Sequence, residues 1–254
     1  MAIRTTRTSA WLYSTANLPT TGAWTFCTLA RLNTDHNAYA QFMGAMGTAP
    51  ATNYWVMQVD STGTALEFYS QTERSMGVSM SVGEWVFLAM RKTGSTGGHG
   101  IVVKLDTGTM YKNEDDTTNY VDAFTQITLG NYDTDTGNGI DADFAAIKFW
   151  DASLTDAELM LEAYSLRPRR TADLNRWSPG FHSVLADAIK DYSGNGRDWS
   201  QYGTNAVADG PPVGWGAPIW IPQYTVASGI PVLSSPSMSS ITATTGVPRV
   251  TLTF

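Results

Sequence analysis

The chain has 254 residues, of which 43% are apolar and 15% are charged, with a formal net charge of −7 at pH 7. This length permits one large domain or one domain with an appendage. The negative balance argues against a nucleic-acid-binding protein, because phosphate contacts need clustered Lys and Arg. Low charge combined with nine Trp, eleven Tyr and nine Phe favours β structure, since aromatic side chains suit a pleated sheet.

The N-terminal stretch and the single cysteine narrow the class of protein further. Residues 1–16, MAIRTTRTSAWLYSTA, contain no continuous apolar run, so we expect no secretory signal peptide. No segment approaches the roughly 18 apolar residues of a membrane span. Cys27 has no partner for an intrachain disulfide and is expected to be a buried small hydrophobe. These features predict a soluble protein that is not exported by an N-terminal signal.

Short alternating segments separated by clusters of Gly, Asn, Asp, Ser and Thr recur from Trp11 to Trp150. Their spacing predicts a series of antiparallel strands and is typical of a sandwich or jelly roll. The stretches TGSTGGHG (residues 93–100) and NEDDTTN (residues 113–119) are expected to be turns. The expected strands cover residues 24–32, 54–60, 65–71, 84–92, 100–106, 123–132 and 142–150.

One short helix is expected directly after the last of these strands. Thr155 is a candidate N-cap, and Glu158 stands three residues later, at the spacing of a capping box. Leu154 and Leu159 have the spacing of a hydrophobic staple across this N-terminus. The apolar residues expected to pack inward are Leu154, Leu161 and Tyr164.

The C-terminal part of the chain has a different composition. Residues 183–188 are expected to form a short helical turn, and residues 197–203 a strand-like segment. Seven of the eleven prolines then fall between Pro211 and Pro248, a density that no helix or central strand tolerates. We therefore expect a domain of residues 1–208 and an extended C-terminal arm of residues 209–254. The residues of the arm expected to bind a partner are Trp215, Trp220, Val250, Leu252 and Phe254.

The order of these segments resembles a known family. GAWTFCTLARL is followed by GEWVFLAMRK, GIVVKLDTG, ITLGNY, an acidic GIDADFAAIKFWDASLTDAELM and a DYSGNG turn. This order is similar to the concanavalin A-like lectin and glucanase superfamily in its laminin-G-like form, over roughly residues 9–203. The resemblance implies an all-β, concanavalin A-like jelly-roll β-sandwich with one short side helix. It also implies lectin-like binding or glycan hydrolysis as the activity.

The C-terminal residues resemble tailed-phage structural proteins. GPPVGW and PVLSSPSMSSITATTGVPRVTLTF look like sequences of virion proteins whose jelly-roll modules decorate capsids, fibres or tail tips. This resemblance implies a non-enzymatic structural protein on the surface of a virus particle, made in the host cytoplasm. Such a protein is expected to form a homo-oligomer and to contact other virion proteins. The alternative is a carbohydrate-binding module for host-surface glycans, and a glycan hydrolase is the third hypothesis.

An acidic loop, NYDTDTGNGIDADF (residues 131–144), is the candidate metal site. Its side-chain oxygens are dense enough for a hard cation such as Ca²⁺, which takes six to eight oxygen ligands. The resemblance implies that this loop lies at the rim of the sandwich, where calcium sites of laminin-G-like domains are built. The alternative is a simple turn in which Asp accepts backbone hydrogen bonds, so we expect no cofactor and leave calcium open. The candidate ligands are Asp133, Asp135 and Asp141, followed by Asp191, Asn195 and Asp198.

No catalytic residue is expected. Glucanases of the resembled superfamily carry an E-x-D-x-x-E strand that places carboxylates on one side of the sheet, and the sequence has no such motif. The nearest acidic run contains Glu114 and Asp116 without a third partner. The histidines have no spacing of a catalytic triad or metal site and are expected in surface loops. They are His36, His99 and His182.

Aromatic residues supply the candidate sugar-binding surface. Sugar-binding sites stack Trp or Tyr on the faces of sugar rings, while Asp and Asn bind the hydroxyl groups. Most aromatic residues of a sandwich lie in its core, so burial of these rings is the alternative. The candidates for glycan binding are Tyr54, Trp55 and Tyr69, with Trp11 and Tyr13 as further members.

Overall fold

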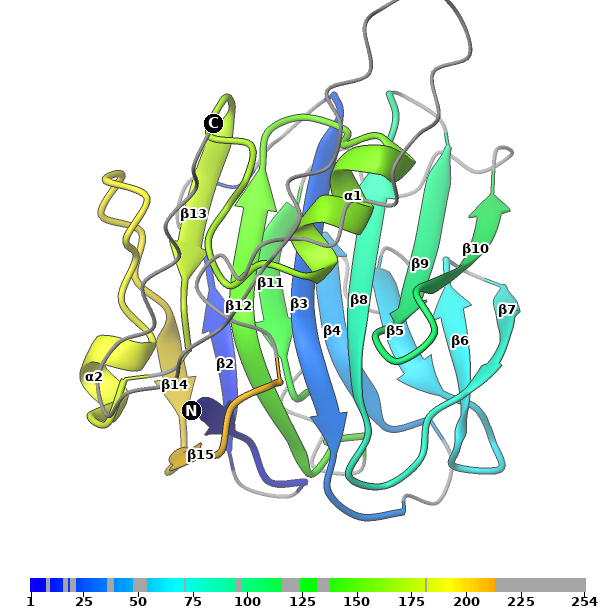
Figure 1. The fold of residues 1–254 in the computed structure, drawn as a ribbon, viewed down its shortest axis with the longest axis horizontal. Helices are drawn as coiled ribbons and strands as arrows, with labels where there is room; N and C mark the ends of the chain where they lie inside the picture. Colours follow the sequence, from blue (N-terminus) through cyan, green and yellow to red (C-terminus); the bar gives the residue numbers. More distant parts are fainter. Residues whose placement is uncertain are drawn as a thin grey trace, which may run out of the picture. The chain divides into compact units, whose positions relative to one another are not determined.

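The computed structural model describes residues 1–7, 10–15, 18, 22–35, 39–47, 54–70, 72–94, 97–115, 124–131, 138–180 and 182–212. Residues Met1–Pro218 form one compact unit. Its described part is a sandwich of two antiparallel sheets with two short helices (Figure 1). The expected all-β jelly-roll sandwich is thereby confirmed. Among the described residues, no helix has the length and apolar character needed to cross a membrane.

The two sheets differ in strand number and order. The eight-stranded sheet runs β10 (Thr109–Asp115), β9 (Gly98–Lys104), β8 (Trp85–Lys92), β3 (Trp24–Leu32), β12 (Ala142–Trp150), β1 (Ala2–Arg4) and β15 (Ala206–Ala208), with β13 (Leu174–Ser178) also paired to β12. The seven-stranded sheet runs β14 (Ser200–Tyr202), β2 (Trp11–Ser14), β11 (Phe124–Leu129), β4 (Gln41–Gly47), β5 (Tyr54–Val59), β6 (Ala65–Tyr69) and β7 (Glu73–Ser79).

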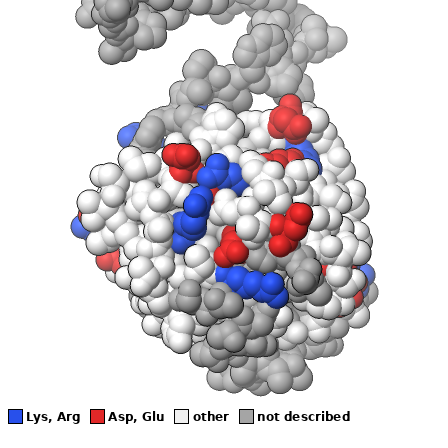
Figure 2. All heavy atoms as spheres, turned by 90° about the horizontal axis from the view of Figure 1, so that it is seen from below, with Lys and Arg blue, Asp and Glu red and all other residues white. Residues whose placement is uncertain are grey.

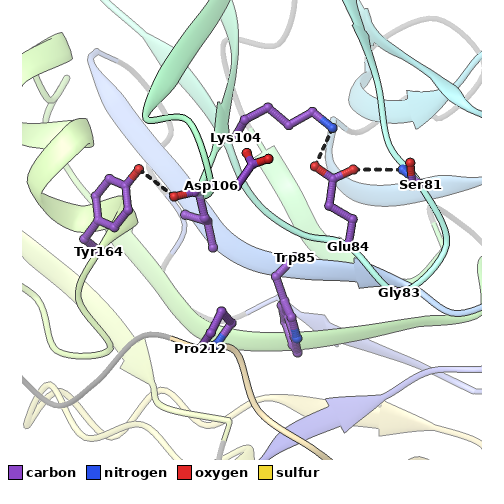
Figure 3. A pocket seen from close by; sticks show the side chains of 9 residues that line it. Ser81, Gly83, Glu84, Trp85, Lys104, Asp106, Tyr164 and Pro212 are labelled. Carbon is purple, nitrogen blue, oxygen red and sulfur yellow. Dashed lines mark hydrogen bonds and ion pairs between the residues drawn. The ribbon is translucent and has the colours of Figure 1, made fainter.

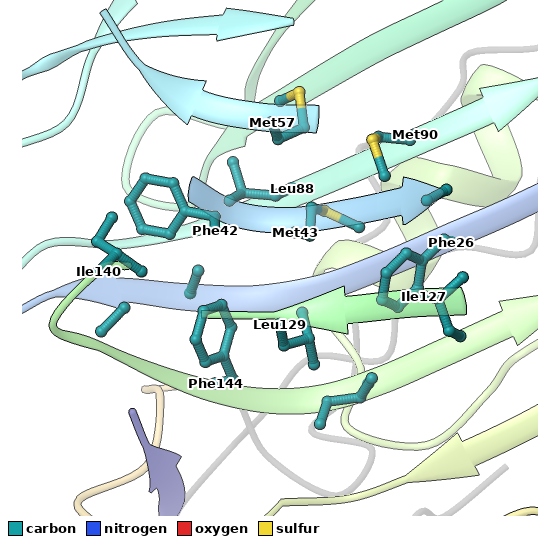
Figure 4. Packing of buried hydrophobic residues seen from close by; sticks show 14 of the residues in the cluster. Phe26, Phe42, Met43, Met57, Leu88, Met90, Ile127, Leu129, Ile140 and Phe144 are labelled. Atoms are coloured by element: carbon teal, nitrogen blue, oxygen red, sulfur yellow. The ribbon is translucent and has the colours of Figure 1, made fainter. Parts of the chain in front are cut away.

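The main core lies between the two sheets. Successive side chains of a strand point to opposite faces, so Leu88 and Met90 of β8 lie in this core while Phe87 and Ala89 lie on the outer face. Figure 4 shows side chains from both sheets meeting in the core. Cys27 lies on the outer face of β3 and is fully buried, as expected.

A helix and its flanking segments cover the outer face of the eight-stranded sheet. In Figure 1, α1 (Asp156–Ala163) lies over β3 and β8. Its Leu159 and Ala163 pack in one cluster with Leu29 and Phe87 of the sheet. The second helix, α2 (Leu185–Ala188), is a single turn within the region where a helical turn was expected.

The N-terminus of α1 is the one predicted from the sequence. The backbone N–H of Glu158 donates to Oγ1 of Thr155 over 3.2 Å, and the N–H of Thr155 donates to Oε2 of Glu158 over 2.8 Å. These two bonds satisfy donors that a helix start otherwise leaves free. The predicted capping box is therefore confirmed, and Leu154 and Leu159 are both fully buried beside it.

The inward face of α1 is partly ionic, which the sequence pattern did not predict. Leu161 is 41% exposed, so the prediction that it packs inward is wrong. Glu162 is buried instead, and Nζ of Lys148 on β12 donates to its Oε2 over 2.7 Å. Lys148 also donates to the carbonyl oxygens of Glu162 and Ser165, and Glu162 Oε1 accepts the N–H groups of Arg169 and Arg170. This pair anchors α1 to the sheet.

A second ionic cluster joins β1, β12 and β3 on the same outer face. Asp143 is buried and accepts hydrogen bonds from Arg4, Arg31 and Asn33 at 2.5–3.0 Å. Burial opposes ionisation, but these donors hold the pKa of Asp143 below its ordinary value. On the side of the molecule seen in Figure 2, basic and acidic side chains likewise lie next to one another.

Two glycines of the expected TGSTGGHG turn belong to β9 and face the core. A Cβ on Gly98 would lie 2.8 Å from the indole of Trp55, and a Cβ on Gly100 would lie 2.5 Å from Cβ of Phe68. These positions therefore stay without side chains so that the opposite sheet can approach. His99 between them is buried, with Nδ1 accepting from Nε of Arg91 over 3.2 Å. The prediction of a surface loop for His99 is wrong.

Several strands were not among those expected, including β4, β7 and β10. β4 and β7 have the sequences QFMGAMG and ERSMGVS, in which Gly, Met and Ser replace the β-branched residues that signal a strand. β10 extends to Asp115, so the first three residues of the expected NEDDTTN turn end a strand. Residues 116–119 of that stretch and residues 213–254 of the expected arm lie outside the described residues.

The Lys148–Glu162 pair yields a stability prediction. Lys148→Met leaves the carboxylate of Glu162 buried without its cation, so we expect the free energy of unfolding to fall by about 3–5 kcal/mol. The matched control is Lys190→Met, because Lys190 is exposed, and we expect a change within about 0.5 kcal/mol. Chemical denaturation monitored by tryptophan fluorescence measures both, and equal effects of the two substitutions would contradict the anchoring role.

Candidate functional site

The outer face of the seven-stranded sheet carries polar and aromatic side chains in cross-strand rows. One row runs across β4, β5, β6 and β7 and consists of Gln41, Gln58, Glu67 and Ser75. The next row runs from β2 to β7 and consists of Tyr13, Thr128, Gly44, Val56, Tyr69 and Glu73. Side chains directly opposite on neighbouring strands lie within contact distance. We call the part of this face formed by Tyr39, Gln41, Tyr54, Gln58, Glu67, Tyr69 and Glu73 the polar–aromatic surface.

The first row contains buried polar groups that are not all satisfied. Gln41 and Gln58 are each 4% exposed. The side chain of Gln58 donates to the carboxylate of Glu67. Oε1 of Gln41 and Oε2 of Glu67 are both buried and accept no hydrogen bond from the described residues. Because an unsatisfied buried acceptor costs roughly 1–3 kcal/mol, such atoms favour a donor from a ligand or from water.

Two tyrosines beside this row form a stacked pair. The rings of Tyr54 on β5 and Tyr69 on β6 lie 4.9 Å apart, centroid to centroid, at an interplanar angle of 16°. Both side chains are partly exposed. Stacked rings at a sheet surface give a flat apolar platform with polar hydroxyl edges.

Tyr39 and Glu73 close the other side of the surface. The hydroxyl of Tyr39 donates to the carboxylate of Glu73, and the charge of Glu73 raises the pKa of Tyr39. The backbone of Tyr39 has a φ of 58°, in the left-handed region that non-glycine residues seldom adopt. A strained backbone of this kind is often found at functional sites.

The electrostatics of the surface are negative. Burial raises the pKa of Glu67, and the nearby charges of Glu73 and Asp60 raise it further, against the hydrogen bond from Gln58. Arg74 is the only Lys or Arg among the described strand residues of the seven-stranded sheet. A raised carboxyl pKa marks a place where a further negative charge is disfavoured.

Together these groups have the chemistry of a binding site for a polar ring compound. Aromatic faces hold the apolar side of such a ring, while amide and carboxylate oxygens accept its hydroxyl groups. A few convergent polar groups beside apolar surface are the usual composition of a small-molecule site.

The glycan-binding candidates from the sequence have different positions. Tyr54 and Tyr69 lie together on the polar–aromatic surface, and their role stays a prediction. Trp55 is 1% exposed and packs in the core against Trp24 and Phe68, so its indole has no face open to a ligand. Trp11 is 3% exposed and stacks on Tyr202.

Sequence reasoning missed Gln41, Gln58 and Glu67. Gln58 and Glu67 sit between apolar residues of an alternating strand, which is a usable signal for the exposed side of a sheet. Their convergence depends on the register of three strands, which a single sequence does not reveal.

The candidate metal ligands are only partly described. Asp133 and Asp135 lie outside the described residues. Asp141 accepts from the backbone N–H of Arg7 over 2.8 Å and from Oγ1 of Thr34 over 3.1 Å. Among the described residues, no three His, Cys, Asp or Glu side chains form a group suited to a metal ion. Calcium binding by the 131–144 loop stays a prediction.

The DYSGNGRDW turn uses its acidic residues for backbone contacts. Asp191 accepts from the N–H groups of Trp177, Ser193 and Arg197, and these bonds hold the pKa of Asp191 low despite its burial. Asp198 accepts from the N–H of Asp191 over 2.7 Å. Hydrogen bonding of this kind is sufficient to explain the acidic residues in the turn.

The partner-binding residues predicted for the arm are Trp215, Trp220, Val250, Leu252 and Phe254, and all of them lie outside the described residues.

A cleft of about 850 Å³ lies on the other sheet, where β8 begins and β9 ends (Figure 3). Trp85, Tyr164 and Pro212 are among the residues that line it. Its Lys104 is paired with Glu84 over 2.5 Å, and the hydroxyl of Tyr164 donates to the carbonyl of Leu105 over 3.1 Å. Because these polar groups already have partners, the cleft is a weaker candidate than the polar–aromatic surface.

Comparisons with known proteins identify the fold and no family. No family model matches the sequence, and no curated protein matches it. A solved structure from Bacteroides ovatus ATCC 8483, whose description as a carbohydrate-binding protein is provisional, is similar, with a TM-score of 0.58 and 13% sequence identity over 85% of this chain and 62% of that one.

Tailspike protein 2 from an Escherichia coli O157:H7 bacteriophage is similar over 70% of this chain, with a TM-score of 0.55 and 13% identity. A structure of the enzymatically active domain of the bacteriophage CBA120 tailspike protein 2 gives a TM-score of 0.52 with 14% identity over 67% of this chain. The chain spans 26% and 28% of these two tailspike chains. At these identities the similarity shows a shared sandwich fold.

The unpaired acceptor of Gln41 yields a prediction that separates binding from stability. Gln41→Met keeps the volume and removes an unsatisfied oxygen, so we expect the free energy of unfolding to stay unchanged or rise by up to about 1 kcal/mol. Gln58→Met removes the donor to Glu67, and we expect a loss of about 1–2 kcal/mol. Denaturant titration of both variants tests this. A loss in Gln41→Met as large as that in Gln58→Met would show that Gln41 has a structural partner.

Proposed function

We propose that the sandwich is a non-catalytic carbohydrate-binding domain whose polar–aromatic surface holds the sugar. The observation that carries this proposal is the pair of buried acceptors without partners, Gln41 Oε1 and Glu67 Oε2, beside the stacked rings of Tyr54 and Tyr69. A sugar supplies both a ring face for stacking and hydroxyl donors for the oxygens. The fold similarity to a protein described as carbohydrate-binding supports the same function.

Binding is favoured over hydrolysis by the arrangement of the carboxylates. A retaining glycosidase needs two carboxyl groups about 5 Å apart that flank the scissile bond, and the sequence has no E-x-D-x-x-E strand that would supply them. Here Glu67 accepts a hydrogen bond from Gln58, and Glu73 accepts one from Tyr39, so each carboxylate has a neutral donor beside it. Carboxylates positioned in this way can accept hydrogen bonds from the hydroxyl groups of a sugar.

A role on a virus particle is the second proposal, and it is compatible with the first. The similarity to two tailspike structures and the phage-like C-terminal sequence support it. In this proposal, the sandwich contacts glycans of the host surface. Residues 209–254 join copies of the chain to one another and to other virion proteins through the apolar set from Trp215 to Phe254.

The binding proposal is tested with the full chain on a glycan array, followed by calorimetric titration of the strongest ligand. Tyr69→Ala removes half of the stacked pair, and we expect affinity to fall about tenfold or more, equivalent to roughly 1.4 kcal/mol. Tyr192→Ala is the matched control, because Tyr192 is exposed in the DYSGNGRDW turn, and affinity should not change.

Saturable binding to no glycan, or equal loss in both variants, would overturn the binding proposal. Release of reducing ends that Glu67→Gln abolishes would replace it with hydrolysis.

The virion proposal is tested by the mass of the full chain in solution. We expect light scattering after size exclusion to give a stable oligomer, because a surface built to join copies buries apolar side chains. Replacing both Trp215 and Trp220 by Ser should give a monomer that keeps its sugar affinity. A wild-type monomer at micromolar concentration would contradict assembly through the arm.

A further inference from the structure

We infer that the polar–aromatic surface selects glycans that carry no negative charge and prefers those with free amino groups. This inference rests on the proposed function, and it names the class of sugar that the site accepts. Three features of the sheet support it: the distribution of charge between the two sheets, the type of hydrogen-bonding atom left unpaired, and the acidic residues beside the stacked tyrosines.

Basic residues are segregated between the two sheets. The described strands of the eight-stranded sheet carry eight Lys or Arg residues, and those of the seven-stranded sheet carry one, Arg74. The eight are Arg4, Arg31, Arg91, Lys92, Lys104, Lys112, Lys148 and Arg176. Recognition of carboxylate, sulfate or phosphate groups on a sugar depends on Arg or Lys.

Arg74, the one basic residue in the described strands of the seven-stranded sheet, does not belong to the polar–aromatic surface. Arg74 lies directly opposite Phe68 in the register of β6 and β7. Phe68 lies in the core between the sheets, so Arg74 begins on the inner side of its strand, opposite to Glu73 and Ser75. The described residues of β2, β4, β5, β6, β7 and β11 therefore place no cationic side chain on the polar–aromatic surface.

The two unpaired side-chain atoms of the polar–aromatic surface are both hydrogen-bond acceptors. Oε1 of Gln41 and Oε2 of Glu67 need a donor from the ligand. Hydroxyl groups and ammonium groups donate, whereas a carboxylate or sulfate ester presents only further acceptors. A carboxylate or sulfate group placed against these oxygens would leave them unsatisfied and would add a charge of the same sign beside them, and such mismatched pairs are a common source of specificity.

The acidic residues also define where a cation would be held. Glu73 on β7 lies directly opposite Tyr69, Glu67 lies in the neighbouring row on β6, and Asp60 directly follows β5. Burial raises the pKa of Glu67, and repulsion from Glu73 and Asp60 raises it further. An ammonium group placed among them relieves this repulsion and forms charge-assisted hydrogen bonds, which are stronger than neutral ones.

The test uses a glycan array that contains neutral, amino-bearing and acidic members, with the full chain as the probe. We expect the bound set to consist of neutral and amino-bearing glycans. We then compare the strongest neutral ligand with its matched derivatives, one in which a hydroxyl is replaced by an amino group and one in which a hydroxymethyl is oxidised to a carboxylate. The amino derivative should bind at least as tightly as the parent, and the carboxylate about tenfold or more weakly.

Charge variants link this preference to the named residues. The double variant Glu67→Gln with Glu73→Gln should reduce the difference between the amino and carboxylate derivatives by about tenfold or more. Glu84→Gln is the matched control, because Glu84 lies in the cleft of the other sheet, and it should leave the difference unchanged. Added salt should weaken the amino derivative more than the neutral parent.

The outcomes separate this inference from the proposed function. Acidic glycans among the strongest ligands, or a preference that survives the double variant, would overturn the inference while leaving carbohydrate binding in place. Binding to no glycan of any class would overturn both.

Discussion

The structure depends on which residues the two outer faces of the sandwich carry and on what covers them. Every strand that buries one side in the common core presents its other side outward, and that side must be covered or must face solvent. On the eight-stranded sheet, apolar residues such as Leu29 and Phe87 face outward and are covered by α1. The buried Lys148–Glu162 pair holds α1 in place. The seven-stranded sheet has polar and aromatic residues in the same positions, and no described helix lies over them.

The two sheets also differ in how their charged side chains are paired. On the eight-stranded sheet, basic residues are neutralised by acidic partners, as Arg4 and Arg31 are by Asp143. On the seven-stranded sheet, Glu67 and Glu73 are held by neutral donors, Gln58 and Tyr39. A carboxylate paired with an amide keeps its charge and stays available to a ligand, whereas one paired with arginine does not. In the proposed function, this difference in charge pairing makes one sheet a scaffold and the other the binding surface.

Local signals predicted much of the fold. Trp24–Leu32 and Ala142–Trp150 alternate strongly and were predicted to the residue, and Thr155 with Glu158 specified the start of α1. The failures have non-local causes. Gly98 looks like part of a turn, and only its approach to Trp55 explains why it belongs to a strand. Leu161 was expected to pack inward but is exposed, whereas Glu162 is buried and pairs with Lys148, fourteen residues earlier in the chain. The candidate site was half predicted: Tyr54 and Tyr69 were named, whereas Gln41, Gln58 and Glu67 converge only through the register of three strands.

Hydrogen–deuterium exchange with and without a saturating glycan tests the central claim most directly, because it maps the contact surface onto the backbone without altering any residue. The account predicts slower exchange on binding in β5, β6 and β7, with the segments around Gln58, Glu67 and Glu73 most affected. Exchange in α1 should not change. Protection confined to the cleft at Ser81–Trp85 and Lys104–Asp106 would contradict the assignment of the polar–aromatic surface as the binding site.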